Sequence, residues 1–200
     1  KELKDIEIKI LIYKDVLNFQ TESLKYFDIP FELIDDFEVK TKKLILLETG
    51  MNDLMQVDDV LFIAHDSKKK IHSDNVKKNF ESFFLSRKGS SRHSDLEDEV
   101  FSKLKNFKTI NTSQLNFEDQ VNTFDKAKHL ISWHGSGLAN LIWMNKGSKV
   151  VEIFLDDHIN YVFQSLSSIK KIDYLRINEK DLRNNFEEVI KKINNFFDNQ

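Results

Sequence analysis

The chain has 200 residues, of which 40% are hydrophobic, and its formal net charge is −3. Such a chain can bury the core of one ordinary domain or of two small lobes, while its composition excludes intrinsic disorder and its charge argues against a nucleic acid polymer as partner. The lack of cysteine excludes disulfides, thiolate metal sites and cysteine nucleophiles, and no apolar run reaches the ~18 residues of a membrane span.

The first 78 residues alternate between short apolar runs and helical patterns. Apolar runs of strand length predict β-strands at 8–13, 42–49 and 59–65. A helical stretch over 17–27 ends before Pro30, because a proline disfavours helix in the residue that precedes it. A second helix is predicted over 72–83. Residues 1–78 are therefore expected to form a partial, acceptor-side α/β lobe, too short for a complete Rossmann lobe.

From residue 79 the alternation is more regular. Strands are predicted at 83–88, 107–112, 129–134, 149–154 and 172–177, and helices at 96–104, 117–124, 137–147, 158–168 and 178–196. Ser94 and Glu97 have the spacing of a capping box, and Asn116 is a good N-cap. Residues 79–200 are thus expected to form a Rossmann-like, doubly wound and mostly parallel α/β sheet with helices on both faces.

The first candidate site is the loop His134–Gly137, between a predicted strand and a predicted helix. Ligands of doubly wound sheets bind at the carboxyl ends of strands, and a helix start with glycines lets backbone N–H groups approach a phosphate. The loop therefore fits a diphosphate cradle, with a plain tight turn as an equal alternative. An α/β-hydrolase would need a G-x-S-x-G elbow, and the spacing of Gly135-Ser136-Gly137 does not provide one.

Two other features lie at the ends of predicted strands. Arg87 and Arg92 flank the corner after the strand at 83–88, and guanidinium groups match phosphate oxygens in bidentate geometry. The alternative is a solvated basic surface. Glu152 interrupts the apolar strand at 149–154, and an acid at a strand end commonly holds a ribose hydroxyl in nucleotide sites. For Glu152 the alternative is an edge strand with the carboxylate in water.

These pieces, in this order, resemble the family 61 glycosyltransferases. That family has a strand ending in Ser-Arg, a second arginine near a helix that opens with an acid, an "F-x-E-Q-V" helix, then "HGAGL-x-N" and "PG-x-K-V-V-E-L". The resemblance is close over 83–154 and looser over 159–175. The residues that match the family's motifs are Arg87, Arg92, Glu97, His134, Gly135, Gly137, Asn140 and Glu152.

The chain departs from the family pattern at three places. Ser136 stands where alanine is usual, and Asn145-Lys146-Gly147 replaces a Pro-Gly turn. Leu96 stands where asparagine often precedes the acid, which weakens any catalytic role for Glu97. We therefore assign Glu97 to the helix cap.

The resemblance implies a GT-B architecture of two Rossmann-like lobes, with residues 79–200 as the donor lobe. It also implies an inverting hexosyl- or pentosyltransferase that moves a sugar from a nucleotide-sugar donor to a saccharide acceptor. The predicted donor-binding residues are Arg87, Arg92, Gly135, Ser136, Gly137, Asn140 and Glu152, with Glu152 on the ribose. The sequence does not identify the catalytic base. His134 is the first candidate, with a hydrogen bond to the donor as its alternative role. Asp156 and Asp157, just past the strand at 149–154, are weaker candidates.

No cofactor is predicted with certainty, and no cluster of acids requires a metal, although a divalent metal stays open. The short N-terminal segment leaves a second reading, a non-catalytic nucleotide-binding or scaffolding module. The chain begins with Lys1 rather than Met, and the sequence leaves open whether it is a piece of a longer protein. The expected setting is surface or capsular polysaccharide biosynthesis in the cytoplasm, with membrane association only through other parts of that protein.

Overall fold

The computed structural model of the chain describes residues 9–16, 18–35, 61–66, 79–90, 93–155 and 160–199. The chain divides into two compact units, Lys1–Met51 and Asn52–Gln200. This division falls earlier than the predicted boundary after residue 78. Residues on both sides of residue 51 and residues 67–78 lie outside the described ones, so the predicted boundary stays a prediction.

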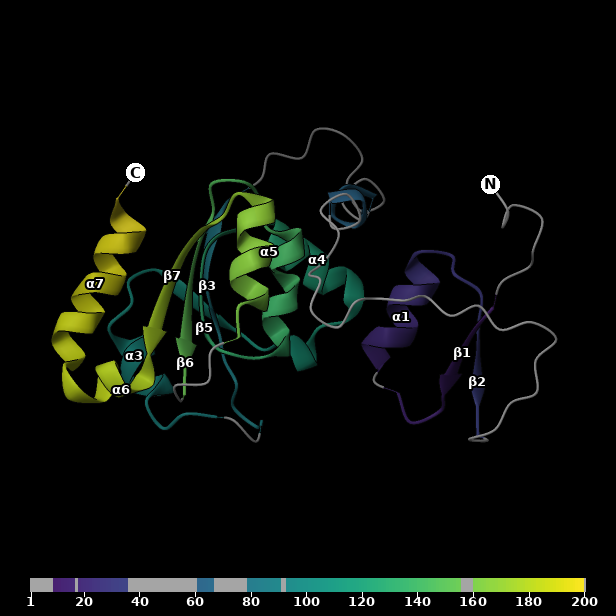
Figure 1. The fold of residues 1–200 in the computed structure, drawn as a ribbon, viewed down its shortest axis with the longest axis horizontal. Helices are drawn as coiled ribbons and strands as arrows, with labels where there is room; N and C mark the ends of the chain where they lie inside the picture. Colours follow the sequence, from purple (N-terminus) through teal and green to yellow (C-terminus); the bar gives the residue numbers. More distant parts are fainter. Residues whose placement is uncertain are drawn as a thin grey trace. The chain divides into compact units, whose positions relative to one another are not determined.

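The described residues of the first unit form a strand–helix–strand motif. Its elements are β1 (Ile10–Tyr13), α1 (Asn18–Tyr26) and β2 (Phe31–Ile34) (Figure 1). β1 and β2 pair in parallel, with Ile10 opposite Phe31. The predictions of β1 and α1 are confirmed. β2 was not predicted, because its four residues after Pro30 are too few to show an alternating pattern, and the strand expected at 42–49 lies outside the described residues.

A parallel sheet forms the centre of the second unit. Its strands are β3 (Glu81–Leu85), β4 (Phe107–Ile110), β5 (Ala127–Trp133), β6 (Lys149–Phe154) and β7 (Asp173–Asn178). The described strands of this sheet are all parallel and lie in the order β4-β3-β5-β6-β7. This arrangement confirms the predicted Rossmann-like α/β fold. The strand order reverses between β3 and β5, which is the topological switch point where such sheets bind ligands.

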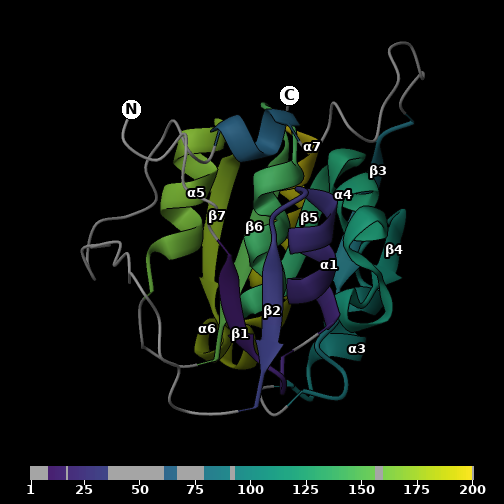
Figure 2. The same ribbon diagram turned by 90° about the vertical axis from the view of Figure 1, so that its right-hand side faces the viewer.

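Helices cover both faces of the sheet. The α-helices are α3 (Glu97–Ser102), α4 (Phe117–Asp125), α5 (Val162–Lys170), α6 (Glu179–Asn184) and α7 (Phe186–Asp198), and the 3-10 helices are η1 (Thr112–Gln114) and η2 (Ser136–Trp143). Figure 1 shows α3, α6 and α7 on one face and α4 and α5 on the other. Figure 2 looks onto the face of α4 and α5, with β4 and β7 at opposite edges.

Alternate residues of the strands supply the core beneath α3, α6 and α7. This cluster of buried side chains comprises Phe84, Val100, Ile131, Trp133, Val151, Ile153, Ile177, Leu182, Val189, Ile190, Ile193 and Phe197. Burying each large apolar side chain contributes roughly 1.5–3 kcal/mol. The intervening strand residues face α4, η2 and α5, and on β6 that set includes the polar Glu152. The buried side chains between the sheet and its helices thus fix the positions of the carboxyl ends of the strands.

Several elements differ from the sequence predictions. Residues 61–66 are helical rather than a strand, because a short apolar run does not distinguish the two. The helix expected at 137–147 is the shorter 3-10 helix η2. The single helix expected over 178–196 is broken at Asn185, whose φ and ψ of −141° and 52° are not helical. Helices α6 and α7 therefore form separate segments.

Candidate functional site

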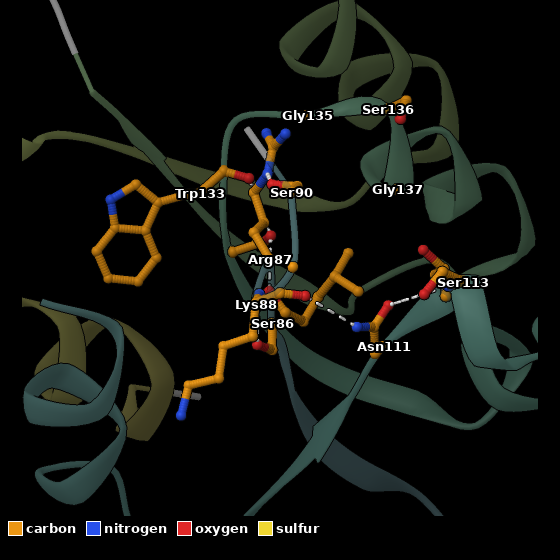
Figure 3. Close-up of a pocket in the computed structure, with 14 residues that line it drawn as sticks. Ser86, Arg87, Lys88, Ser90, Asn111, Ser113, Trp133, Gly135, Ser136 and Gly137 are labelled. Carbon is orange, nitrogen blue, oxygen red and sulfur yellow. Dashed lines mark hydrogen bonds between the residues drawn. The ribbon is translucent and has the colours of Figure 1, made fainter. Parts of the chain in front are cut away.

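A pocket of about 280 Å³ lies at the carboxyl ends of β3, β4 and β5 (Figure 3). Its walls come from three segments that follow these strands. The described lining residues are Leu85, Ser86, Arg87, Lys88, Gly89, Ser90, Asn111, Thr112, Ser113, Ser132, Trp133, Gly135, Ser136 and Gly137. The pocket therefore sits at the switch point between β3 and β5, where the fold itself favours ligand binding.

Arg87 joins two of the predicted site segments. Its Nη1 donates a hydrogen bond to the main-chain oxygen of His134, and its Nε donates to Ser90 Oγ over 3.3 Å. Figure 3 shows the Arg87 side chain reaching from the end of β3 to Gly135. The corner after β3 and the loop after β5 therefore share one site, as the sequence predicted.

The close approach of Arg87 explains the glycine at position 135. The φ of Gly135 is 172°, an extended conformation that any residue adopts, so the backbone itself does not require glycine. A Cβ atom at this position, however, would lie 2.5 Å from Arg87 Cζ. Gly137 is also confined, because its Cβ would lie 3.0 Å from Leu85 Cδ2. Both glycines make room for side chains of β3 and the corner that follows it.

The chemistry of the pocket suits an anion. Arg87 and Lys88 are its cationic residues, and the described residues that line it include several hydroxyls but no Asp or Glu. Lys88 extends away from Arg87, and its Nζ lies 2.6 Å from Asp98 Oδ1 on α3 (Figure 3). Arg87 is thus the principal charge at the corner. The first turn of η2 adds backbone N–H groups and the positive end of a helix dipole.

Glu97 has a different role from the one that the sequence predicted. Its buried carboxylate does not close a capping box with Ser94. Instead, Oε1 accepts the main-chain N–H of Arg87 at 2.9 Å, and Oε2 accepts the hydroxyl of Ser86 at 2.8 Å. Ser86 Oγ in turn accepts the N–H of Lys88 at 3.1 Å. Glu97 therefore fixes the strand end that carries Arg87.

One wall of the pocket was missed from the sequence. Asn111, Thr112 and Ser113 follow β4 and face the corner after β3. Asn111 Oδ1 accepts hydrogen bonds from the N–H of Ser113 at 3.0 Å and from its hydroxyl at 2.8 Å. The sequence does contain a signal for this wall, namely a run of three small polar residues at the end of the predicted strand at 107–112, whose neighbour in the sheet is β3.

The side chain of His134 lies on the other side of this loop. Its Nδ1 is 2.5 Å from Glu152 Oε1, and the Tyr174 hydroxyl donates to Glu152 Oε2 over 2.5 Å. The imidazole stacks on Phe154 with ring centroids 4.9 Å apart. His134 does not line the pocket, but its main-chain oxygen holds Arg87 there. One residue thus connects the pocket to a second polar cluster.

Glu152 is fully buried within this second cluster. Burial raises the pKa of its carboxyl, while the bonds from Tyr174 and His134 and the charge of Arg176 act in the opposite direction. Burial and the bond to Glu152 also raise the pKa of Tyr174. Glu152 is fully buried and does not line the pocket, and each of its oxygens already has a hydrogen-bond partner. Its role as a ribose ligand stays a prediction.

Comparison with protein-family models supplies an independent finding. Residues 9–151 match the model of Glycosyltransferase 61. The chain belongs to this family. Membership implies a glycosyltransferase with a sugar donor and an acceptor as substrates. The match begins at residue 9, just before β1, so on its N-terminal side it extends well beyond the segment on which the resemblance was based. No curated protein matches the chain significantly.

The two remaining residues predicted to bind the sugar donor in this family 61 glycosyltransferase are Asn140 and Arg92. Asn140 lies outside the pocket lining, where its Nδ2 donates to Gln120 Oε1 and to the main-chain oxygen of Gly137, each over 3.0 Å. Its Oδ1 accepts the indole N–H of Trp143. The Asn140 side chain thus links η2 to α4 and also bonds within η2. The geometry gives no support to its predicted contact with the nucleotide-sugar donor. Arg92 lies outside the described residues, as do Asp156 and Asp157.

Within the described part of this glycosyltransferase, no group of three or more His, Asp or Glu side chains is arranged to hold a metal ion. The involvement of a divalent metal stays open, as it did from the sequence. The described helices also include none long and apolar enough to cross a bilayer.

Proposed function

We propose that this family 61 glycosyltransferase binds the diphosphate of a nucleotide-sugar donor in the pocket at the ends of β3, β4 and β5. One observation carries the proposal. The guanidinium of Arg87 and the start of η2 meet at the switch point of the sheet, in a pocket whose described lining has no carboxylate. Backbone N–H groups and guanidinium groups are the donors that bind phosphate oxygens most readily.

The dimensions of the pocket support a diphosphate rather than the whole donor. Sites for complete small-molecule ligands usually enclose about 300–1,000 Å³, and this pocket encloses about 280 Å³. The nucleoside and the sugar therefore extend beyond the described walls. In the GT-B architecture that we propose for the protein, a second lobe faces these groups and shapes the acceptor site.

Charge stabilisation is the main chemical role that we assign to the pocket. As the bond between the anomeric carbon and the diphosphate oxygen breaks, negative charge grows on the departing nucleoside diphosphate. Arg87 and the N–H groups of Ser136 and Gly137 would stabilise that charge, and such electrostatic terms usually dominate catalysis. The acceptor hydroxyl attacks the opposite face of the sugar, which gives inversion, and a base must take up its proton; His134 is the candidate for that role.

Isothermal titration with UDP, GDP and CMP tests the donor site. We expect the wild-type protein to bind at least one of the two diphosphates more tightly than the monophosphate CMP. The substitution Arg87→Ala should weaken that binding at least ~10-fold, because a hydrogen bond to a charged group contributes about 1.5–3 kcal/mol. Equal and weak binding of all three nucleotides by both proteins would contradict the proposal.

Turnover separates this proposal from its alternative. Release of sugar from nucleotide-sugar donors, to water or to saccharide acceptors, is expected from the enzyme. Nucleotide binding without any turnover would instead favour the non-catalytic binding or scaffolding module. The roles in surface-polysaccharide assembly and the cytoplasmic location stay predictions.

A further inference from the structure

A buried hydrogen-bonded chain ends at the loop that holds Arg87. It runs from Tyr174 on β7 through Glu152 on β6 to His134 at the end of β5. These strands are neighbours in the sheet, and Glu152 lies between Ser132 and Arg176 in the strand register. The chain therefore crosses the half of the sheet that lies beside the pocket and leads to its edge.

The position of Glu152 requires an explanation. It is the polar member of the otherwise apolar buried segment Val150–Phe154, and its exposed fraction is 0%. A buried carboxylate is costly unless hydrogen-bond donors satisfy it. Here each oxygen has one short bond, to His134 and to Tyr174 respectively. An apolar side chain could be buried at this position without the desolvation penalty of a carboxylate. What the carboxylate provides in return is its hydrogen bond to His134.

The imidazole is held in one orientation. It stacks on Phe154 at an interplanar angle of 17° and lies against Phe163 of α5, with ring centroids 5.6 Å apart. Only 19% of the His134 side chain is exposed. Since Nδ1 points at the buried carboxylate, the opposite edge of the ring, which carries Nε2, is the edge toward solvent.

We propose that Glu152 and Tyr174 are positioning residues that hold His134 with its proton on Nδ1 and present Nε2 as the proton acceptor of the transfer reaction. The hydrogen bond that the Tyr174 hydroxyl donates to Oε2 favours the ionised form of Glu152. An ionised carboxylate has no proton to donate, so it accepts from Nδ1, and the neutral ring then has a basic Nε2. This inference rests on the proposed function. It decides between the two roles that the sequence left open for His134, in favour of the base.

The proton balance of the step follows from this geometry. The acceptor oxygen forms a bond to the anomeric carbon, and the diphosphate leaves with the electron pair of the broken bond. The hydroxyl proton moves to Nε2 of His134, and the resulting imidazolium faces the carboxylate of Glu152. Product release and loss of that proton to solvent restore the neutral ring.

The charged groups around His134 come from three strands. Glu152 lies on β6, Tyr174 and Arg176 lie on β7, and Arg87 follows β3 and contacts the main-chain oxygen of His134. Arg176 lies over the ring of Phe154, 5.0 Å from its centroid. Helix η2 has no charged side chain, and α5 contributes Phe163. Among the residues that the structure describes, Glu152 is thus the carboxylate that contacts the imidazole.

Nitrogen-15 NMR of the histidine side chains tests the tautomer without any substrate. In wild-type protein near neutral pH we expect the Nδ1 resonance of His134 to be that of a protonated nitrogen and the Nε2 resonance that of an unprotonated one. A spectrum with the proton on Nε2 would overturn the inference. Titration calorimetry on the same sample shows independently whether the donor site binds, so failure of the proposed function is distinguishable.

Kinetics supply the second test. Glu152→Gln keeps the shape but removes the charge, and we expect kcat to fall ~10²–10⁴-fold with the donor KM changed less than ~3-fold. The acid limb of the kcat profile should move to lower pH, because the imidazolium loses its counter-charge. Tyr174→Phe should lower kcat more mildly, and Glu118→Gln on the exposed side of α4 should change nothing.

Folding is monitored in parallel, because Glu152 is buried. If Glu152→Gln fails to fold, Tyr174→Phe and the wild-type NMR spectrum carry the test. A loss of donor affinity with an unchanged kcat and an unchanged pH profile in either variant would assign the carboxylate to a purely structural role. That outcome would overturn the proposal.

Discussion

Replacing Gly135 by alanine perturbs the contact between the two halves of the pocket with one methyl group. The backbone of Gly135 is extended, so alanine introduces no torsional strain. Its Cβ would lie 2.5 Å from Arg87 Cζ and 3.1 Å from Nη2. Nη1 would lie closer still. Ordinary carbon contacts begin near ~3.5 Å, so the guanidinium must retreat by at least about 1 Å. That shift moves it out of the place that it occupies beside Gly135 in the wall of the pocket.

The magnitude follows from the bonds that Arg87 makes. A hydrogen bond that involves a charged group contributes about 1.5–3 kcal/mol, which corresponds to a factor of ~10–150 in an equilibrium constant. We therefore expect Gly135→Ala to weaken diphosphate binding by a factor in that range. The melting temperature should change by only a few degrees, because the guanidinium is the end of a flexible chain and can move without unpacking the core.

A double-mutant cycle with Arg87→Ala provides the decisive assay. Calorimetric titration with UDP or GDP is performed on both single variants and on the combination. If the methyl group acts through Arg87, Gly135→Ala has almost no further effect once the guanidinium is gone. Additive losses would refute this reasoning. Gly137→Ala is a comparison for the coupling alone: its Cβ would contact Leu85 and Thr112 rather than Arg87, so its effect on binding should add to that of Arg87→Ala.

Two further predictions concern stability. Glu97→Gln should lower the free energy of unfolding by ~2–4 kcal/mol in urea denaturation, because the Gln NH2 group cannot accept the hydrogen bond that Ser86 or Arg87 donates to the carboxylate. Exposed Glu99→Gln is the control, and an equally small effect of Glu97→Gln would contradict the assigned role. Burial lowers the pKa of His129 to about 4, so the unfolded chain alone gains this proton as the pH falls from ~6.5. Between about pH 6.5 and pH 4 the free energy of unfolding should therefore fall by up to about 1 kcal/mol per pH unit, and by less in His129→Leu. The urea midpoints of both proteins are measured at about pH 7 and about pH 5, and an equal decrease in the two would contradict the prediction.

Patterns confined to a few neighbouring residues predicted much of the fold. Asn116 is the N-cap of α4, and its Oδ1 accepts the N–H of Asp119 at 2.8 Å. Strand β6 has the predicted bounds, Lys149–Phe154, because its apolar run is flanked by turn residues. Such signals are local, and local geometry satisfies them whatever the rest of the chain does.

Features that depend on partners far along the chain were not predictable. Glu97 has the spacing of a capping box with Ser94, yet its carboxylate bonds to the strand end at Ser86 and Arg87. The helix expected after Gly137 is a 3-10 helix, and the Asn140 side chain within it bonds to the main-chain oxygen of Gly137 and to Gln120 of α4. The Glu97 bond to the strand end and the Asn140 bond to Gln120 both join segments that are distant in the sequence, and no local pattern indicates such partners.

The loop after β5 brings the proposed binding and proton-transfer roles together at one peptide. The carbonyl of His134 accepts a hydrogen bond from Arg87, while the imidazole of the same residue contacts Glu152. Gly135 leaves the space that Arg87 occupies. A tight turn alone would explain neither the buried carboxylate nor the close approach of the guanidinium. The carbonyl that holds Arg87 and the proposed proton acceptor thus belong to one residue, so a shift of this loop would disturb the proposed binding and proton-transfer roles together.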